Sequence, residues 1–138
     1  MLNCNIFYES WQLDCCGDPF KIGDSVSWIV EKCDKIETMV EIDKIDYVYE
    51  AHSDEWTRLS VFDGTVSRIQ ILYEKFEPEK ENSTSMQRVK GGRLVDVHES
   101  KKWEANLEGL YPVGFVVTFD SHNIRPASKE DISFCQNR

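Results

Sequence analysis

Apolar and polar residues alternate in several short runs of the chain, and this period of two predicts β-strands. The clearest run places Val26, Trp28 and Val30 on one face. The dipeptide Gly23-Asp24 stands just before it and supplies turn residues. The pattern therefore predicts a strand that begins directly after a tight turn.

A longer run from Thr65 to Phe76 predicts a second strand. Its apolar residues Ile69, Ile71 and Tyr73 fall on one face, and polar residues occupy most of the positions between them. Asp63-Gly64, immediately before the run, is a dipeptide typical of hairpin turns. We therefore expect the chain to reverse its direction there.

Other segments predict further strands and short helices. Strands are expected at residues 6–11, 93–98 and 114–119, and the last is an almost uninterrupted apolar run that predicts burial on both faces. Spacing by four between apolar residues favours one or two helical turns over 100–107. The sequence Ser-Lys-Glu-Asp at 128–131 resembles a capping box at the start of a short terminal helix.

Two connecting segments have different characters. The first part of 31–50 allows either a short helix, from the spacing of Ile36, Met39 and Val40, or an irregular connector before a strand at 45–49. Residues 77–92 have few apolar side chains and many turn formers, which predicts a flexible loop.

These runs together predict one mainly β domain over residues 1–138. Six or seven short strands with glycine-containing turns favour a small antiparallel, partly closed barrel, SH3-like or similar, with one or two short helices. The chain has 138 residues, 41% of them hydrophobic, which is enough for a core without structural metals or disulfides.

Negative charge is concentrated in the first half of the chain. The net charge is -9, and residues 1–60 hold 13 acidic against 5 basic residues. Such a half repels phosphate, so we expect no binding to nucleic acid or to an anionic membrane. A basic protein surface is the natural electrostatic partner, and good solubility is the alternative explanation of the charge.

The N-terminus has no basic leader followed by an apolar stretch, and no segment is apolar enough to span a membrane, so we expect a cytoplasmic protein. The five cysteines, an odd number, then fit free thiols in a reducing compartment. The adjacent Cys15 and Cys16 allow a second interpretation, a strained disulfide that is easily reduced.

The usual catalytic signatures for nucleotide, metal and serine chemistry do not occur in the sequence, which favours binding over turnover and predicts no cofactor. We expect an inhibitor or immunity-type protein with an acidic binding face. The candidate binding residues are five acids and an aromatic anchor: Asp43, Asp46, Glu50, Asp54, Glu55 and Trp56. The alternative is a small metal- or thiol-dependent protein that uses Cys15, Cys16 and His52.

A resemblance emerges when several segments are compared together. The chain opens with Trp11-Gln12, followed by Cys-Cys-Gly-Asp-Pro-Phe at 15–20 and Gly-Asp at 23–24. This pattern resembles the start of an uncharacterised family of small bacterial proteins, a domain of unknown function. The resemblance covers most of the chain; it implies a bacterial origin and assigns no activity.

Overall fold

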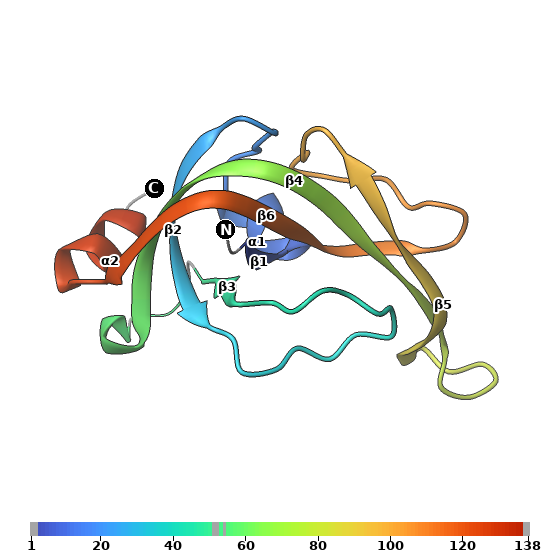
Figure 1. Cartoon of the computed structure of the whole chain (residues 1–138). Coiled ribbons are helices and arrows are strands. Elements are labelled where there is room, and N and C mark those ends of the chain that lie inside the picture. Colours follow the sequence, from blue (N-terminus) through green and yellow to red (C-terminus); the bar gives the residue numbers. More distant parts are fainter. Residues whose placement is uncertain (1–2, 51–52, 54, 137–138) are drawn as a thin grey trace.

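The computed structural model describes residues 3–50, 53 and 55–136, without the side chains of Cys16 and of residues 133–136. The described strands are β1 (Cys4–Glu9), β2 (Ser25–Lys32), β3 (Tyr47–Tyr49), β4 (Leu59–Pro78), β5 (Met86–Val97) and β6 (Tyr111–Pro126). The helices are α1 (Ser10–Cys16), the 3-10 turn η1 (Trp56–Arg58) and α2 (Lys129–Gln136). The protein is therefore mainly β with two short α-helices, as predicted (Figure 1).

The strand pairings close a ring. β1 pairs with β6, β6 with β4, β4 with β2, β2 with β3, and β3 returns to β1. The β1–β3 pair is parallel and the others are antiparallel, so the sheet is mixed and the purely antiparallel prediction is wrong at this pair. The ring closes because β1 pairs with β3 on one edge and with β6 on the other, and these two strands are far apart in the sequence.

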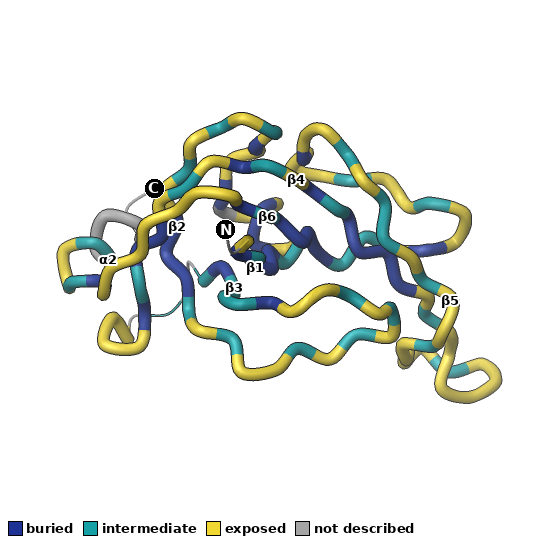
Figure 2. The backbone as a smooth tube through the Cα atoms, viewed as in Figure 1, coloured by how far each residue is buried: buried dark blue, intermediate teal, exposed yellow. Residues whose placement is uncertain are grey.

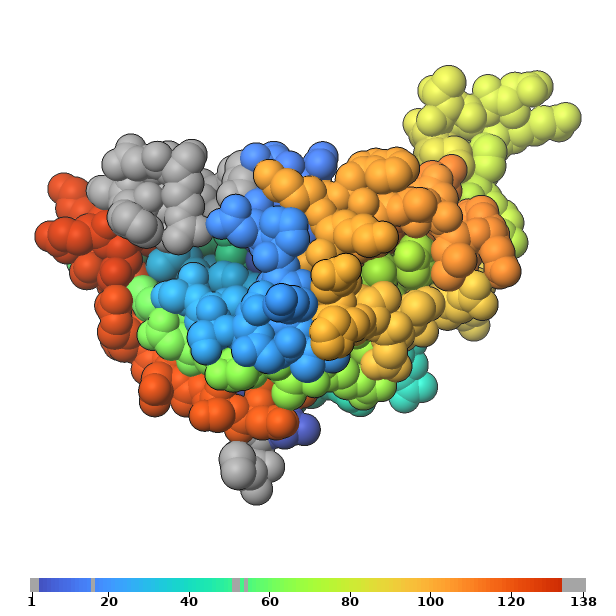
Figure 3. Space-filling model, turned by 90° about the horizontal axis from the view of Figure 1, so that it is seen from above, coloured from blue at the N-terminus to red at the C-terminus, as the bar shows by residue number. Residues whose placement is uncertain are grey.

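β4 is long enough to have two different neighbours along one edge. Its first part pairs with β2, and its second part pairs with β5 as a hairpin whose tip, residues 79–85, projects from the body (Figure 3). The predicted turn at Asp63-Gly64 is wrong, because β4 runs straight through it. A Cβ atom at Gly64 would lie 2.9 Å from the rings of Phe62 and Phe119, so close packing explains this glycine.

Aromatic side chains fill the ring. Tyr8 stacks on Tyr49 with ring centroids 3.8 Å apart, and Trp28 meets Tyr8 and Phe119 edge-on. These residues are buried, as the dark segments of the strands show (Figure 2). The predicted inward faces are confirmed: Trp28, Val30, Ile69, Ile71 and Tyr73 are buried, and Val26 packs against them.

Three local predictions are wrong. Residues 10–16 form α1 and do not continue the first strand, because Leu13 and Gln12 turn into the ring, where the Gln12 amide donates to the Tyr49 carbonyl at 3.1 Å. Residues 86–92 belong to β5, which pairs with β4, so the predicted loop shrinks to the hairpin tip. Residues 100–107 form no helix; their backbone is anchored by the Ser100 contacts with Phe20.

Two segments cover the outer surface of the ring. α2 and the two residues before it bury Ala127 and Ile132 against Ile29, Leu59 and Val61. On another part of the surface, residues 33–46 between β2 and β3 lie across the outward face of β1, β4 and β6. These residues have no helix, so the irregular-connector alternative is confirmed. We call residues 33–46 the connector.

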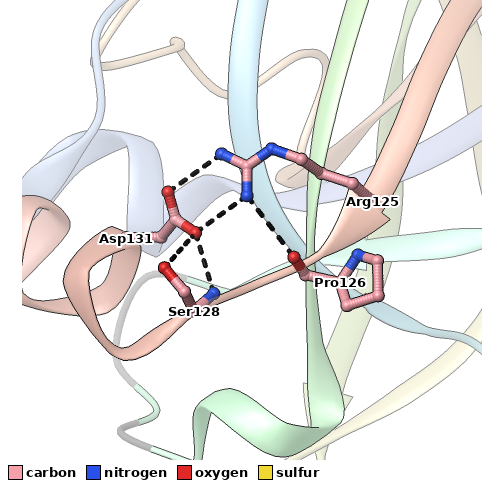
Figure 4. A network of polar contacts seen from close by, with 4 residues as sticks. All are labelled: Arg125, Pro126, Ser128 and Asp131. Carbon is pink, nitrogen blue, oxygen red and sulfur yellow. Dashed lines mark hydrogen bonds and ion pairs between the residues drawn. The ribbon is translucent and has the colours of Figure 1, made fainter.

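One half of the predicted capping box forms at the start of α2, the hydrogen bond from the Ser128 N–H to the Asp131 carboxylate. The backbone N–H and the hydroxyl of Ser128 donate to Asp131 Oδ2 at 2.8 and 2.9 Å, and Arg125 donates to both carboxylate oxygens at 3.0 Å (Figure 4). The Arg125 hydrogen bonds, with those from Ser128, hold the pKa of Asp131 well below its ordinary value.

Asp131→Asn is expected to lower the free energy of unfolding by about 1 kcal/mol at neutral pH. Because the folded pKa of Asp131 is depressed, its stabilisation is present above the unfolded pKa and declines progressively below about pH 4. Urea unfolding at pH 7 and pH 2.5 should therefore show a smaller difference between the variant and the wild type at the lower pH. Glu130→Gln, an exposed neighbour, is the control; an Asp131→Asn effect equal at both pH values would contradict this account.

Candidate binding site

The connector is held by its apolar side chains to the outside of the sheet. It has an outgoing limb, residues 33–38, and a returning limb, residues 40–45, which appear as separate paths in Figure 1. Half-buried side chains from both limbs pack on buried residues of the sheet; the cluster comprises Cys33, Ile36, Val40, Ile42 and Ile45 with Phe7, Leu72 and Val116. The connector is therefore part of the packed structure.

Exposure alternates along the connector with a period of two. From 36 to 43, every second residue is half-buried and those between are exposed. This is the pattern of an extended strand lying flat on a surface. The exposed positions carry Glu37, Met39, Glu41 and Asp43, and Met39 is 47% exposed. The outward face of the connector is thus acidic, with one apolar side chain in its centre.

A buried carboxylate fixes the connector to the sheet. Glu74 on β4 is completely buried and accepts the backbone N–H of Met39 at 3.2 Å and Arg88 Nη1 at 3.3 Å. The same Arg88 nitrogen donates to the Glu37 carbonyl at 2.9 Å. We call these contacts the Glu74 clasp. They tie the far end of the connector to both strands of the β4–β5 hairpin.

The sequence did not point to Glu74. Its position directly after the inward-facing Tyr73 places it on the outer face of β4, where a glutamate normally meets water. The available signal was the apolar character of other outward positions, Leu72 on β4 and Val116 on β6, which indicates that something covers this face. The alternation of apolar and polar residues shows on which face of the sheet a side chain lies. It does not show which segment of the chain covers that face.

Two hollows are lined by most residues of the outgoing limb. The larger, about 720 Å³, is lined by residues 33–45 and Arg88, so it lies between the two limbs; we call it the connector cavity. The second, about 350 Å³, lies between the outgoing limb and the sheet, where Phe7, Leu72 and Val113 contribute to an apolar wall beside Glu74. Both volumes are within the range of ligand-binding cavities.

The charge of the connector is not neutralised locally. It holds five acidic and two basic residues. Within the described part of the chain, Asp34, Glu37, Glu41 and Asp43 form no ion pair within 4.0 Å. Asp43 acts only at longer range, where it adds to the effect of Asp96 in raising the pKa of Arg68. These four carboxylates therefore remain available to an external cation.

The predicted binding residues do not form one cluster. Asp43 lies on the outward face of the connector, whereas the Asp46 carboxylate turns inward and accepts the Asn5 N–H at 2.9 Å. Glu50 follows β3 and is half-buried. Glu55 and Trp56 lie at η1, where Glu55 meets Arg58 at 3.4 Å and Trp56 is 40% exposed. Asp54 lies outside the described residues.

The described thiols are poorly suited to nucleophilic chemistry. Burial, reinforced by Asp46, raises the pKa of Cys4 to about 12, and burial also raises the pKa of Cys33. Both are therefore neutral near pH 7. Cys15 takes part in a disulfide bond, so the prediction of free thiols holds for Cys4 and Cys33 but is wrong for Cys15. An odd number of cysteines leaves one unpaired but does not exclude a disulfide among the rest.

The metal alternative depends on residues that the structure does not describe. His52 and the Cys16 side chain both lie outside the described part. Among the described histidines, cysteines and acids, no three come together in a group that could hold a metal ion. Cys15, bonded in its disulfide, does not offer a free thiolate. The proposed set of Cys15, Cys16 and His52 therefore stays a hypothesis.

A family model for proteins of unknown function, DUF6578, matches residues 2–121 of the chain. No curated protein and no solved structure matches it. Among the described residues, no helix is long and apolar enough to cross a membrane.

Proposed function

We propose that this chain, which belongs to DUF6578, a family of unknown function, binds a basic protein partner through the outward face of the connector and catalyses no reaction. The observation that carries the proposal is a row of exposed carboxylates on a segment whose other face is packed against the sheet. Charge held on a fixed backbone directs association and selects a complementary surface. An inhibitor or immunity-type protein acts in this way.

The connector favours such a role more than η1 does. At η1, Glu55 is already paired with Arg58, and the same arginine binds Glu31 at 2.8 Å. On the connector, exposed acids flank Met39, which offers an apolar contact at the centre of a charged rim. Of the six residues predicted from the sequence, Asp43 therefore contributes most directly, and Glu37 and Glu41 join it.

Reversing two connector charges tests the proposal. Glu41→Lys with Asp43→Lys is expected to reduce capture of a basic protein from a lysate of the source organism at least tenfold, because two attractive contacts become repulsive. The reduction should be larger at 20 mM than at 300 mM salt, since salt screens exposed charges. Quantitative mass spectrometry of the captured proteins measures it, and the affinity is then measured with the purified partner.

The matched control carries the same charge change elsewhere. Asp14→Lys with Asp18→Lys alters two exposed acids in and after α1 and keeps the total charge of the test variant. We expect this control to capture the partner as the wild type does. Equal losses in both variants would mean that only net charge matters, and unchanged capture in the test variant would remove the connector from the interface.

The proposal also includes the expectations from the sequence about origin, location and type of barrel. We propose that the protein is bacterial and cytoplasmic, and that the ring is related to SH3-like barrels. The metal- or thiol-dependent alternative receives no support from the neutral Cys4 and Cys33 thiols. The repulsion of phosphate by the acidic connector agrees with a protein partner in preference to nucleic acid or an anionic membrane.

A further inference from the structure

We infer that the connector cavity accepts an extended basic segment of the partner as an added β-strand between the two limbs. This inference rests on the proposed function and specifies how the partner is bound. Strand addition needs unpaired backbone groups on extended chain, a cavity beside them, and side chains that select the incoming sequence. The connector provides evidence for each requirement.

The backbone of the limbs has almost no partner within the protein. Among the described residues, no backbone–backbone hydrogen bond joins residues 34–45 to one another or to the sheet. The limbs are linked only at their base, where the Cys33 N–H donates to the Asp46 carbonyl at 3.0 Å. Side chains of Asn5, Thr38, Glu74 and Arg88 engage a few single groups. The limbs therefore carry unpaired backbone groups with which an inserted strand can form hydrogen bonds.

The alternation of exposure orients these backbone groups. Ile36, Val40 and Ile42 point toward the sheet, while Glu37 and Glu41 point to solvent. In an extended chain, backbone N–H and C=O groups project sideways, at right angles to both sets of side chains. Along each limb they are therefore directed to its two sides, one of which faces the connector cavity.

The side chains define the chemistry of the occupant. The cavity has an apolar base, to which Ile36, Val40, Ile42 and Ile45 contribute. Its lining includes four carboxylates without an ion pair in the described structure, those of Asp34, Glu37, Glu41 and Asp43, and three cations, Lys35, Lys44 and Arg88, so acids are in excess. An extended segment that alternates apolar residues with lysine or arginine matches both, with its apolar side chains inward and its cations at the rim.

Both ends of the connector are fixed to the sheet before binding. The Glu74 clasp anchors the far end of the connector, and Asn5 bonds both the Asp46 backbone and the Lys44 carbonyl near the base. Gly92 of β5 fits closely beneath the connector, since a Cβ there would lie 2.8 Å from Val40 Cγ2. A site that is already open loses less conformational entropy on binding. Each limb has six residues, which in extended form span about 17 Å from the first Cα to the last.

Three synthetic peptides test strand addition on the full chain. The probe is fluorescein-labelled acetyl-KVKVKVK-amide; the second peptide has the same sequence with its three valines N-methylated, and the third replaces every lysine by glutamate. Fluorescence polarisation should show saturable binding of the probe, at least tenfold weaker binding of the N-methylated peptide, and none of the acidic peptide. N-methylation removes backbone donors and leaves every charge in place.

The same protein variants separate the two proposals. Glu41→Lys with Asp43→Lys should weaken probe binding at least tenfold, whereas Asp14→Lys with Asp18→Lys should not. Equal binding of the probe and its N-methylated form, still abolished by the connector reversal, would overturn strand addition and retain the acidic face. Probe binding that the connector reversal leaves unchanged would count against both proposals.

A second copy of the chain is the other occupant to be tested. Sedimentation of the unlabelled protein should show a monomer across 5–200 μM. A dimer that Glu41→Lys with Asp43→Lys dissociates would show that the connector of one copy pairs with another copy, and would overturn the proposed basic segment.

Discussion

Arg88→Met is expected to lower the free energy of unfolding by about 3 kcal/mol, because it leaves the buried Glu74 carboxylate without its cation. The expected value is at the lower end for a broken buried pair, since the Arg88 side chain is 40% exposed and water can approach from that side. Urea unfolding followed by tryptophan fluorescence measures the change. Hydrogen exchange should also become faster at the Met39 amide, which the clasp holds.

Glu74→Gln is the informative companion to that variant. The amide still accepts from the Met39 N–H, and no buried charge remains, so the expected loss is about 1 kcal/mol. Combining Glu74→Gln with Arg88→Met should be less destabilising than Arg88→Met alone. A single Arg88→Met effect no larger than that of Glu74→Gln would mean that the carboxylate does not depend on Arg88.

Phe119→Ala is expected to lower the free energy of unfolding by about 4 kcal/mol. Phe119 is completely buried in the ring, with its ring centroid 4.7 Å from that of Phe62 and 5.6 Å from that of Trp28. Truncation removes these contacts and opens a cavity that the surrounding strands cannot close without breaking pairing. The midpoint of urea unfolding reports the loss, with an unchanged slope if the unfolding remains two-state.

Trp103→Ala is the control for removal of an aromatic side chain. Trp103 is 73% exposed, so its replacement should change the free energy of unfolding by less than about 0.5 kcal/mol. A small effect for Phe119→Ala together with a large one for Trp103→Ala would contradict the assignment of the interior to the ring.

Local alternation predicted the strands whose side chains have clear inner and outer faces. Val26, Trp28 and Val30 in β2 and Ile69 to Tyr73 in β4 were assigned correctly, because the period of two directly reflects burial. Local alternation does not predict which strands pair with one another when they are far apart in the sequence. The ring depends on contacts between β1 and β6, and no property of either segment alone identifies its partner.

Tertiary contacts explain the local errors. Asp63-Gly64 has the composition of a turn, but Gly64 lies within β4 and gives space to the rings of Phe62 in the same strand and Phe119 in β6. Residues 86–92 are polar and rich in glycine, yet β4 offers them a free edge to pair with. The predicted first strand extends two residues too far, because residues 10 and 11 begin α1, which buries Leu13 in the core.

The candidate site was only partly predictable for a related reason. The excess of acid in the first half of the sequence indicated a basic partner, and the connector holds much of that excess. Composition did not show that Asp46 turns inward while Asp43 faces solvent. The Glu74 clasp was missed because its function depends on a segment that lies more than 30 positions away in sequence.

The pairing of β1 with β6 also determines when the sheet can finish folding during translation. Cys4 is opposite Phe119 in the sheet, so β1 leaves the ribosome well before the strand with which it pairs. At typical elongation rates of about 5–20 residues per second, this interval lasts several seconds. Throughout that time β1 displays an apolar face and an open edge, which makes the nascent chain a candidate client for chaperones that shield unpaired strands.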